Sequence, residues 1–251
     1  VMSARKALVD ALAPPTGNNR IRLCTADNVD LVDALKGLFQ DSAEIKSQYR
    51  DGVMGRTGGF EFAENTLLST YTRGAANTSY TVNGANQTGS SLVVQSGSGA
   101  MNKGDVFTIA GVFRVHPETK ASTGVLQQFV ITAAYSGGGG TVSISPSIVT
   151  SGATQTVSAS PANAAAITFA GTASTASGLS LAYNPDAFTF ATADLMMPSG
   201  VDFAARKVMD GISMRIVRQY DINNDRLPCR IDVLYGYKTI RPQLACRLAA
   251  N

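Results

Sequence analysis

The chain has 251 residues, of which 44% are hydrophobic and only 16% are charged. Because soluble chains usually carry about 25% charged residues, this composition favours a surface that is buried against neighbouring molecules. The net charge of +3, with basic residues spread along the chain, gives no support for a nucleic-acid ligand, and no apolar run approaches the roughly twenty residues of a membrane span.

The first third of the chain predicts helices and short strands. Asp27 or Asn28 is expected to cap a helix, because such side chains accept hydrogen bonds from the free amides of a helix start. A proline- and asparagine-rich break at 14–19 and a glycine-rich loop at 52–59 separate the elements. The expected elements are a helix at 2–12, a strand at 20–25, helices at 29–40 and 42–49, and strands at 60–62 and 65–72.

From about residue 75 the sequence is rich in small and β-forming residues. No charged side chain occurs between Lys120 and Asp186, and Asn83-Gly84 is a strong signal for a tight hairpin. A small β-barrel or sandwich is therefore expected. Charged residues normally protect strand edges from pairing with other molecules. Without them, such a domain is expected to aggregate as a monomer and to be partly protected when it is packed in a lattice. Its clearest predicted strands are at 106–115, 125–132 and 141–148.

The last forty residues predict a β-ribbon. Two strands with a period of two, typical of half-buried strands, flank a polar turn at 221–228. Arg241-Pro242 ends the second strand, because proline has no amide N–H for the sheet. The alternating apolar residues are Ile212, Met214, Ile216, Ile231, Val233 and Tyr235.

No catalytic, cofactor-binding or metal-binding residue is predicted. His116 is the only histidine, and its position before a Pro-Glu-Thr-Lys turn favours an exposed turn residue over a catalytic base. Ser3 and Lys6 have the Ser-x-x-Lys spacing of penicillin-recognising enzymes, but the other motifs of those enzymes are missing. The cysteines lack metal-site spacing and are expected to be reduced structural thiols. They are Cys24, Cys229 and Cys246.

The polar turn near the end of the chain resembles the first half of a calcium loop. Asp221, Asn223 and Asp225 alternate as oxygen ligands do in such loops. Arg226, however, stands where the loop needs glycine, and Asp232 stands where it needs glutamate. A solvated hairpin turn is therefore the favoured interpretation.

Six arginines are concentrated in the same region, and two interpretations of them stay open. They lie on solvated strand edges, or they form ion pairs between subunits with acidic residues such as Asp202 or Asp232. The six are Arg215, Arg218, Arg226, Arg230, Arg241 and Arg247.

Several segments, in the same order along the chain, resemble the major capsid (coat) proteins of tailed bacteriophages with the Hong Kong 97-type fold. In that family the long peripheral sheet is followed by an aromatic-rich stretch, an Arg-Pro pair and a short apolar strand. Tyr235, Gly236, Tyr237, Arg241, Pro242, Leu244 and Ala245 occupy those places. Residues 49–52 and 59–61 resemble the approach to the inserted domain of short-tailed Salmonella-phage coat proteins, and 80–84 and 101–112 resemble the insertion itself.

The resemblance implies an α+β fold of the Hong Kong 97 type, with axial and peripheral domains and an inserted small all-β barrel or sandwich. It also implies an N-terminal arm and an extended loop ahead of residue 1, which were cleaved or were not ordered. The implied domains are 1–19 (end of the spine helix and linker), 20–75 and 166–200 (axial domain), 76–165 (inserted domain) and 201–251 (peripheral ribbon and C-terminal strand).

The function implied by the resemblance is structural. The chain would assemble as hexamers and pentamers into the icosahedral head of a tailed bacteriophage around double-stranded DNA, without catalysis or cofactors. Implied partners are scaffolding, portal and decoration proteins, with at most non-specific DNA contact and no membrane. The implied location is the virion, after synthesis in the bacterial host cytoplasm. The alternative is a carbohydrate-binding β module of a phage or surface adhesin, against which the absence of tryptophan argues.

Overall fold

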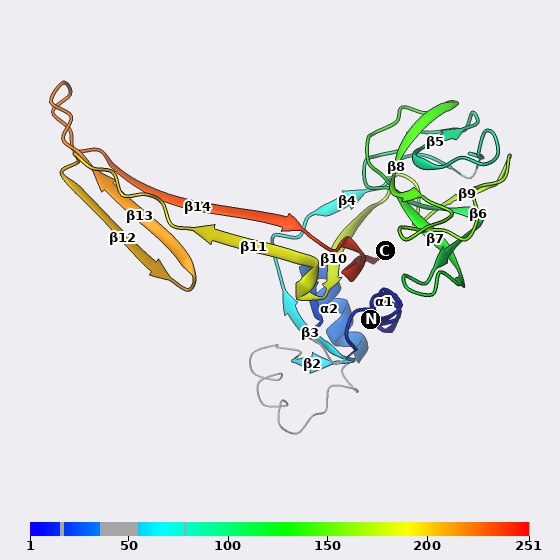
Figure 1. Ribbon diagram of the computed structural model, residues 1–251. Helices are drawn as coiled ribbons and strands as arrows, with labels where there is room; N and C mark the ends of the chain where they lie inside the picture. Colours follow the sequence, from blue (N-terminus) through cyan, green and yellow to red (C-terminus); the bar gives the residue numbers. More distant parts are fainter. Residues whose placement is uncertain (16–17, 36–54, 78, 251) are drawn as a thin grey trace. The chain divides into compact units, whose positions relative to one another are not determined.

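The computed structural model describes residues 1–15, 18–35, 55–77 and 79–250. The chain divides into two compact units. The first comprises Val1–Asn184 together with the segment from Ala245, and the second is Pro185–Leu244. The described part of the chain is mainly β-strand, with α1 (Met2–Val9) and α2 (Thr25–Leu35) as its α-helices (Figure 1).

The first unit contains a mixed sheet of six strands, called the central sheet below. Its strand order is β15-β10-β1-β3-β2, and β4 also pairs with β10. Alternate residues of its strands face inward, so that Ile21 and Phe60 are completely buried. Leu8 of α1 is also buried, and α1 contacts β15. The strands are β1 (Arg20–Leu23), β2 (Arg56–Thr57), β3 (Phe60–Glu64), β4 (Thr70–Thr72), β10 (Ala176–Tyr183) and β15 (Ala245–Ala250).

The predicted helix caps Asp27 and Asn28 are wrong. Helix α2 begins at Thr25, and the amide of Asn28 already donates to the carbonyl of Cys24 at 2.9 Å. Asp27 therefore lies in the first helical turn, where its carboxylate accepts a hydrogen bond from the Ser180 hydroxyl of β10. The remainder of the helix predicted at 29–40, the helix predicted at 42–49 and the motif at 49–52 lie outside the described residues.

The first unit also contains an antiparallel β-barrel. Its strand order is β5-β8-β7-β6-β9. Between the two outer strands runs the segment Tyr80–Val82, in which Val82 pairs with Val94 of β5 and Thr81 pairs with Ala166, next to β9. The two edges are thereby joined. The strands are β5 (Gly89–Val94), β6 (Val106–Val115), β7 (Ser122–Ile131), β8 (Gly140–Ile148) and β9 (Ile167–Phe169), which confirms the three predicted strands.

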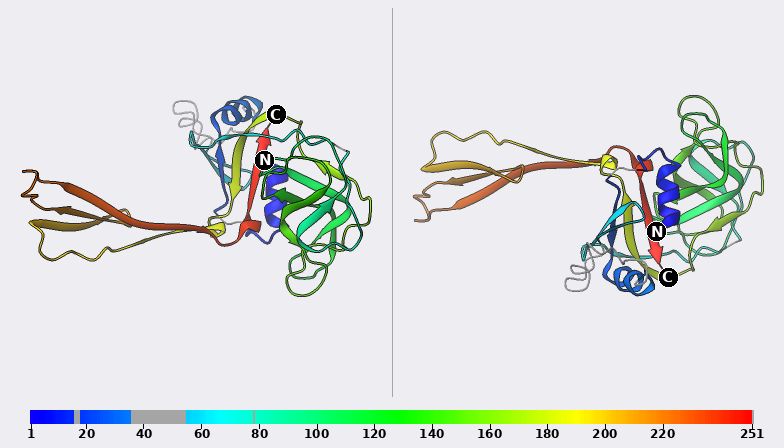
Figure 2. Two further views of the ribbon diagram at one scale, coloured as in Figure 1. Left: turned by 90° about the horizontal axis from the view of Figure 1, so that it is seen from above. Right: turned by 90° about the horizontal axis from the view of Figure 1, so that it is seen from below.

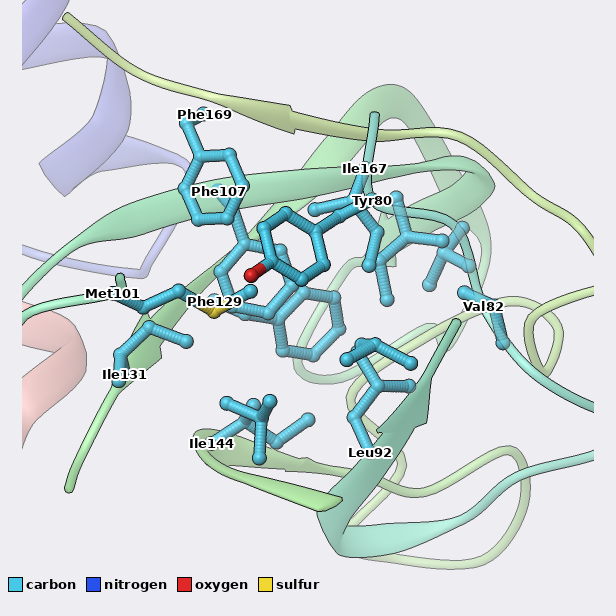
Figure 3. Packing of buried hydrophobic residues seen from close by; sticks show 14 of the residues in the cluster. Tyr80, Val82, Leu92, Met101, Phe107, Phe129, Ile131, Ile144, Ile167 and Phe169 are labelled. Carbon is cyan, nitrogen blue, oxygen red and sulfur yellow. The ribbon is translucent and has the colours of Figure 1, made fainter. Parts of the chain in front are cut away.

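Aromatic and aliphatic side chains fill the barrel (Figure 3). The rings of Phe107 and Phe129 are stacked with centroids 5.7 Å apart, and the ring of Tyr80 meets Phe169 edge-on at 6.2 Å. Such pairs add to the free energy gained by burying the rings. The barrel therefore has the hydrophobic core of an independently packed domain, and these aromatic rings do not form an exposed platform for a sugar.

The hairpin predicted at Asn83-Gly84 has a longer loop than a two-residue turn: Val82 pairs antiparallel with Val94. The amide of Asn83 donates to the carbonyl of Val93 at 2.9 Å, so the chain returns only after a longer loop. The side chain of Gln87 closes this loop, because its amide donates to Asn83 and Val93 and its oxygen accepts from the Val93 amide. Asn163 accepts the Gly84 amide at 2.8 Å. These side-chain bonds replace those of a two-residue turn.

The second unit is a single antiparallel sheet with the strand order β11-β14-β13-β12. The expected ribbon is formed by β13 and β14, and the predicted polar turn contains the pair Asp221 and Arg226. Of the apolar residues in this unit, only Ala187 and Leu244 are buried. Figure 2 shows no helix or second sheet of the same unit over β12, β13 or β14. The elements are β11 (Phe188–Ala193), β12 (Phe203–Met209), β13 (Ile212–Arg218), β14 (Cys229–Thr239) and two short 3-10 helices, Pro185–Ala187 and Pro242–Leu244.

Candidate assembly surface

The pairing register divides the sheet of the second unit into two chemically different faces. Residues directly opposite each other in antiparallel strands lie on the same face, and successive residues alternate between faces. Ile216 lies opposite Ile231, Met214 opposite Val233, and Phe190 opposite Tyr237. One face, the apolar face, therefore collects Phe188, Phe190, Phe203, Ala205, Met209, Ile212, Met214, Ile216, Ile231, Val233, Tyr235 and Tyr237, together with Lys207, Arg218, Thr192 and Thr239.

The apolar face is open to solvent in the single chain. Tyr237 is 80% exposed, Ile231 67%, and Phe190 and Tyr235 are each 59% exposed. The rings of Phe190 and Tyr235 stack on each other with centroids 6.0 Å apart, which makes the surface continuous across β11 and β14. A sheet needs a second layer to bury its apolar side, and a large exposed apolar patch marks an interaction site. This face is therefore the candidate assembly surface.

The opposite, polar face is occupied by ion pairs within the same chain. Arg215 donates from Nε to Asp232 at 3.2 Å and from a second nitrogen at 2.5 Å, and Arg230 pairs with the same carboxylate at 2.8 Å. The hydrogen bonds from Arg215, the largest effect, and those from Arg230 hold the pKa of Asp232 below its usual value. Arg215 also donates to the carbonyl of Met196. The segment preceding β12 therefore lies against the polar face.

This arrangement differs from that of an ordinary half-buried strand, whose apolar residues are the buried ones. In β13 the buried residue is Ser213, at 5% exposed, whereas Ile212 and Met214 are exposed. Ser213 lies on the polar face, next to the Arg215 that binds the preceding segment. The segment preceding β12 thus covers the polar face around Ser213 and Arg215, whereas the apolar face is open.

Four of the six arginines that the sequence left open have side-chain contacts inside the chain. Arg215 and Arg230 pair with Asp232, so this carboxylate is already engaged without a neighbouring subunit. The guanidinium of Arg218 lies 5.7 Å from the ring centroid of Phe203. Arg247, in the first unit, donates to the carbonyl of Gly104 at 2.6 Å.

The other candidate residues take part in local hydrogen bonds. The Nδ1 atom of His116 accepts from two amides of its own turn, each at 3.3 Å. Asp221 accepts hydrogen bonds from Asn224 and Asn223, which lower its pKa. Asp225 accepts from the Tyr220 hydroxyl at 2.8 Å. Within the described ranges, no group of three or more His, Cys, Asp or Glu side chains is arranged to hold a metal ion.

Lys6 and the three cysteines belong to the remaining motifs. Lys6 forms an ion pair with Asp10 at 2.9 Å. All three cysteines are free, with Cys24 buried, Cys246 half-buried and Cys229 exposed. Burial raises the pKa of the Cys246 thiol, which makes it less reactive at neutral pH. None of the helices in the described part of the chain is long and apolar enough to cross a membrane.

Residues 88–248 match the family described as P22 coat protein, gene protein 5. The match covers more than half of the chain. The chain belongs to the P22 coat protein family. The CUS-3 coat protein I-domain is a similar solved structure, with 33% sequence identity over 37% of this chain and 96% of that domain and a TM-score of 0.29. No curated protein matches the chain. As a member of this coat protein family, the chain is a structural protein of a bacteriophage capsid.

Family membership gives the open sheet a physical meaning. A coat protein assembles into oligomers, and its surfaces are buried against other copies in the capsid. The sequence did not reveal that β11 extends the ribbon and adds Phe188 and Phe190 to the apolar face. The alternation of Phe188 and Phe190 with Thr189 and Ala191 is the signal that could have placed this strand.

Proposed function

We propose that this chain is the subunit that self-assembles into the icosahedral head of a tailed bacteriophage enclosing double-stranded DNA. It acts without catalysis. The observation that carries the proposal is the apolar face in a chain of the coat protein family. Exposed side chains such as Ile231 and Tyr237 stabilise the chain little by themselves. They stabilise an assembly in which another copy covers them.

The proposed architecture is the Hong Kong 97-type fold with an inserted β domain at 76–165. Axial segments at 20–75 and 166–200 would form the centres of hexamers and pentamers, and 1–19 and 201–251 would form the peripheral domain. The proposal is supported by the pairing of β1 with both β3 and β10, because the chain leaves this sheet after β4 and re-enters it at β10. Two strands cross the proposed division: β15 of 201–251 joins the central sheet, and β11 of 166–200 pairs with β14. Scaffolding, portal and decoration proteins are the proposed partners.

The energetics of such an assembly depend on many modest contacts. Covering apolar area contributes about 25 cal/mol per Å², and a closed symmetric shell repeats every contact in each subunit. The low proportion of charged residues, 16%, reduces the cost of removing the subunit surface from water. Assembly in the host cytoplasm also agrees with three free cysteines.

The test is the particle mass of the purified protein, measured by sedimentation and by electron microscopy of the same fractions. We expect closed shells tens of nanometres across, in line with the size of protein shells built from many copies. A stable, monodisperse monomer at every concentration, with or without a scaffolding protein from the same phage, would contradict the proposal.

A further inference from the structure

A carboxylate is buried where the barrel adjoins the segment that leads into it. Asp105 is 1% exposed and is the only charged side chain in the buried class among the described residues. Burying a carboxylate is costly unless hydrogen bonds replace its water. Asp105 receives three donors: the Tyr71 hydroxyl at 2.6 Å, the Asn102 amide at 2.8 Å and the Gly74 amide, which is shared by both oxygens at 3.1 and 3.2 Å.

The backbones of the two side-chain partners belong to different sheets. The carbonyl of Asp105 accepts the amide of Ile131 in β7 at 2.9 Å, so its backbone is part of the barrel. Tyr71 lies in β4, where it pairs with Ser177 of β10 in the central sheet. The bond between the Tyr71 hydroxyl and the Asp105 carboxylate therefore ties the barrel directly to the central sheet.

Arg247 adds a second tie between the same two sheets. It lies in β15, opposite Leu181 of β10, and donates to the carbonyl of Gly104 at 2.6 Å. Its guanidinium carbon lies 5.5 Å from the ring centroid of Tyr71, within the range of a cation–π interaction. Burial, followed by the hydrogen bond to Asp105, raises the pKa of Tyr71, so the hydroxyl keeps its proton and remains a donor at neutral pH.

The segment that enters the barrel, at residues 73–74, and the segment that leaves it, at residue 171, are also closely packed near Asp105. A Cβ atom at Gly74 would lie 2.5 Å from the carbonyl oxygen of Ala100 and 2.6 Å from a carboxylate oxygen of Asp105, so no side chain can be accommodated. On the entry segment, Arg73 donates to the carbonyl of Gly171 on the exit segment at 2.9 Å. Entry and exit are thereby held together.

We propose that Asp105 is a positioning residue, a latch that fixes the barrel on the central sheet through Tyr71 and the amides of Gly74 and Asn102. The barrel core does not need these bonds, because its side chains pack among themselves. The latch instead fixes the orientation of the barrel relative to the central sheet. The consequence for shell geometry rests on the proposed function, since a barrel that swings would present different surfaces to the neighbouring subunits.

The test uses the full chain with three variants: Tyr71→Phe, Asp105→Asn and, as a matched control, Tyr80→Phe. The hydroxyl of the buried Tyr80, like that of the half-buried Tyr71, donates a hydrogen bond, here to the carbonyl of Gly99 at 2.7 Å, but both partners of this bond lie on the barrel side. Hydrogen exchange is measured for the amides of Gly74 and Asn102 and for strand β7, and shells are sized by electron microscopy.

In Asp105→Asn we expect exchange at the Gly74 and Asn102 amides to accelerate by roughly tenfold or more, the loss for bonds to a charged acceptor. In Tyr71→Phe we expect a smaller acceleration. Strand β7 should keep its protection in both, and their shells should become irregular in size, whereas Tyr80→Phe should leave the two amides and the shells unchanged. Unchanged exchange at both amides, or an equal loss of protection in β7, overturns the latch.

The remaining outcomes separate the latch from the proposed function. Faster local exchange with shells of normal size refutes the control of shell geometry by the latch. If the unmodified chain forms no shells, the proposed function fails, and the exchange data alone decide whether the latch exists.

Discussion

Replacing Ile231 by serine is expected to weaken assembly without weakening the isolated subunit. Ile231 is 67% exposed, and substitutions at such positions usually change the free energy of unfolding by less than about 0.5 kcal/mol. Complete burial of an isoleucine side chain contributes about 1.5–3 kcal/mol. Covering its exposed two thirds therefore contributes about 1–2 kcal/mol, so each contact should weaken about 5- to 30-fold.

The assay is the lowest protein concentration at which shells form, measured by sedimentation velocity. Because every subunit makes the same contact, this concentration should rise by at least the same factor. Leu67→Ser is the matched control, since Leu67 is 89% exposed but lies outside the second unit. The reasoning is refuted if Ile231→Ser assembles at the concentration of the unmodified chain, or if its thermal unfolding shows that the subunit itself is destabilised.

Two further predictions concern each unit separately. Hydrogen bonds from Arg215 lower the pKa of Asp232. Their stabilisation of the folded sheet is therefore present above about pH 4 and is lost as the pH falls through the lowered pKa. Hydrogen exchange in β13 and β14 should accelerate over this range of pH, and Asp232→Asn should abolish the pH dependence. In the barrel, a Cβ at Gly97 would lie 2.4 Å from the Tyr80 ring, so Gly97→Ala should lower the free energy of unfolding by about 1–3 kcal/mol, whereas Gly236→Ala, with open space, should not. Equal melting curves for these two alanine variants would contradict this.

The strands of the barrel could be predicted from the sequence because alternation there reflects a real difference in burial. In β6, the residues Phe107 and Ile109 are buried while Thr108 and Ala110 are not, and the predicted strand 106–115 agrees with the observed one. Local signals failed where distant side chains intervened. The Asn83-Gly84 turn is replaced by a loop that the nearby Gln87 and the distant Asn163 stabilise, and a local pattern does not contain Asn163.

The periodicity of the ribbon predicted which residues share a face, but it could not predict which face is covered. Ile212 and Met214 alternate with Ser213 as in a half-buried strand, yet Ser213 is the buried residue. Coverage depends on Arg215, which binds the segment preceding β12 through the carbonyl of Met196. Under the proposed function, the apolar pattern of the ribbon marks a surface that another copy covers rather than the core of the described residues.

Charged side chains are distributed differently at the joined edges of the barrel and at the open edges of the second unit's sheet. Charged side chains normally protect a strand edge, and their absence between Lys120 and Asp186 suggested that the barrel needs a lattice. The segment Tyr80–Val82 joins the two barrel edges, so those strands need no such protection. In the open sheet of the second unit, the outer strand β12 carries Arg206 and Lys207, whereas the other outer strand, β11, carries no charge. An uncharged edge beside an exposed apolar face is the arrangement expected where another subunit binds.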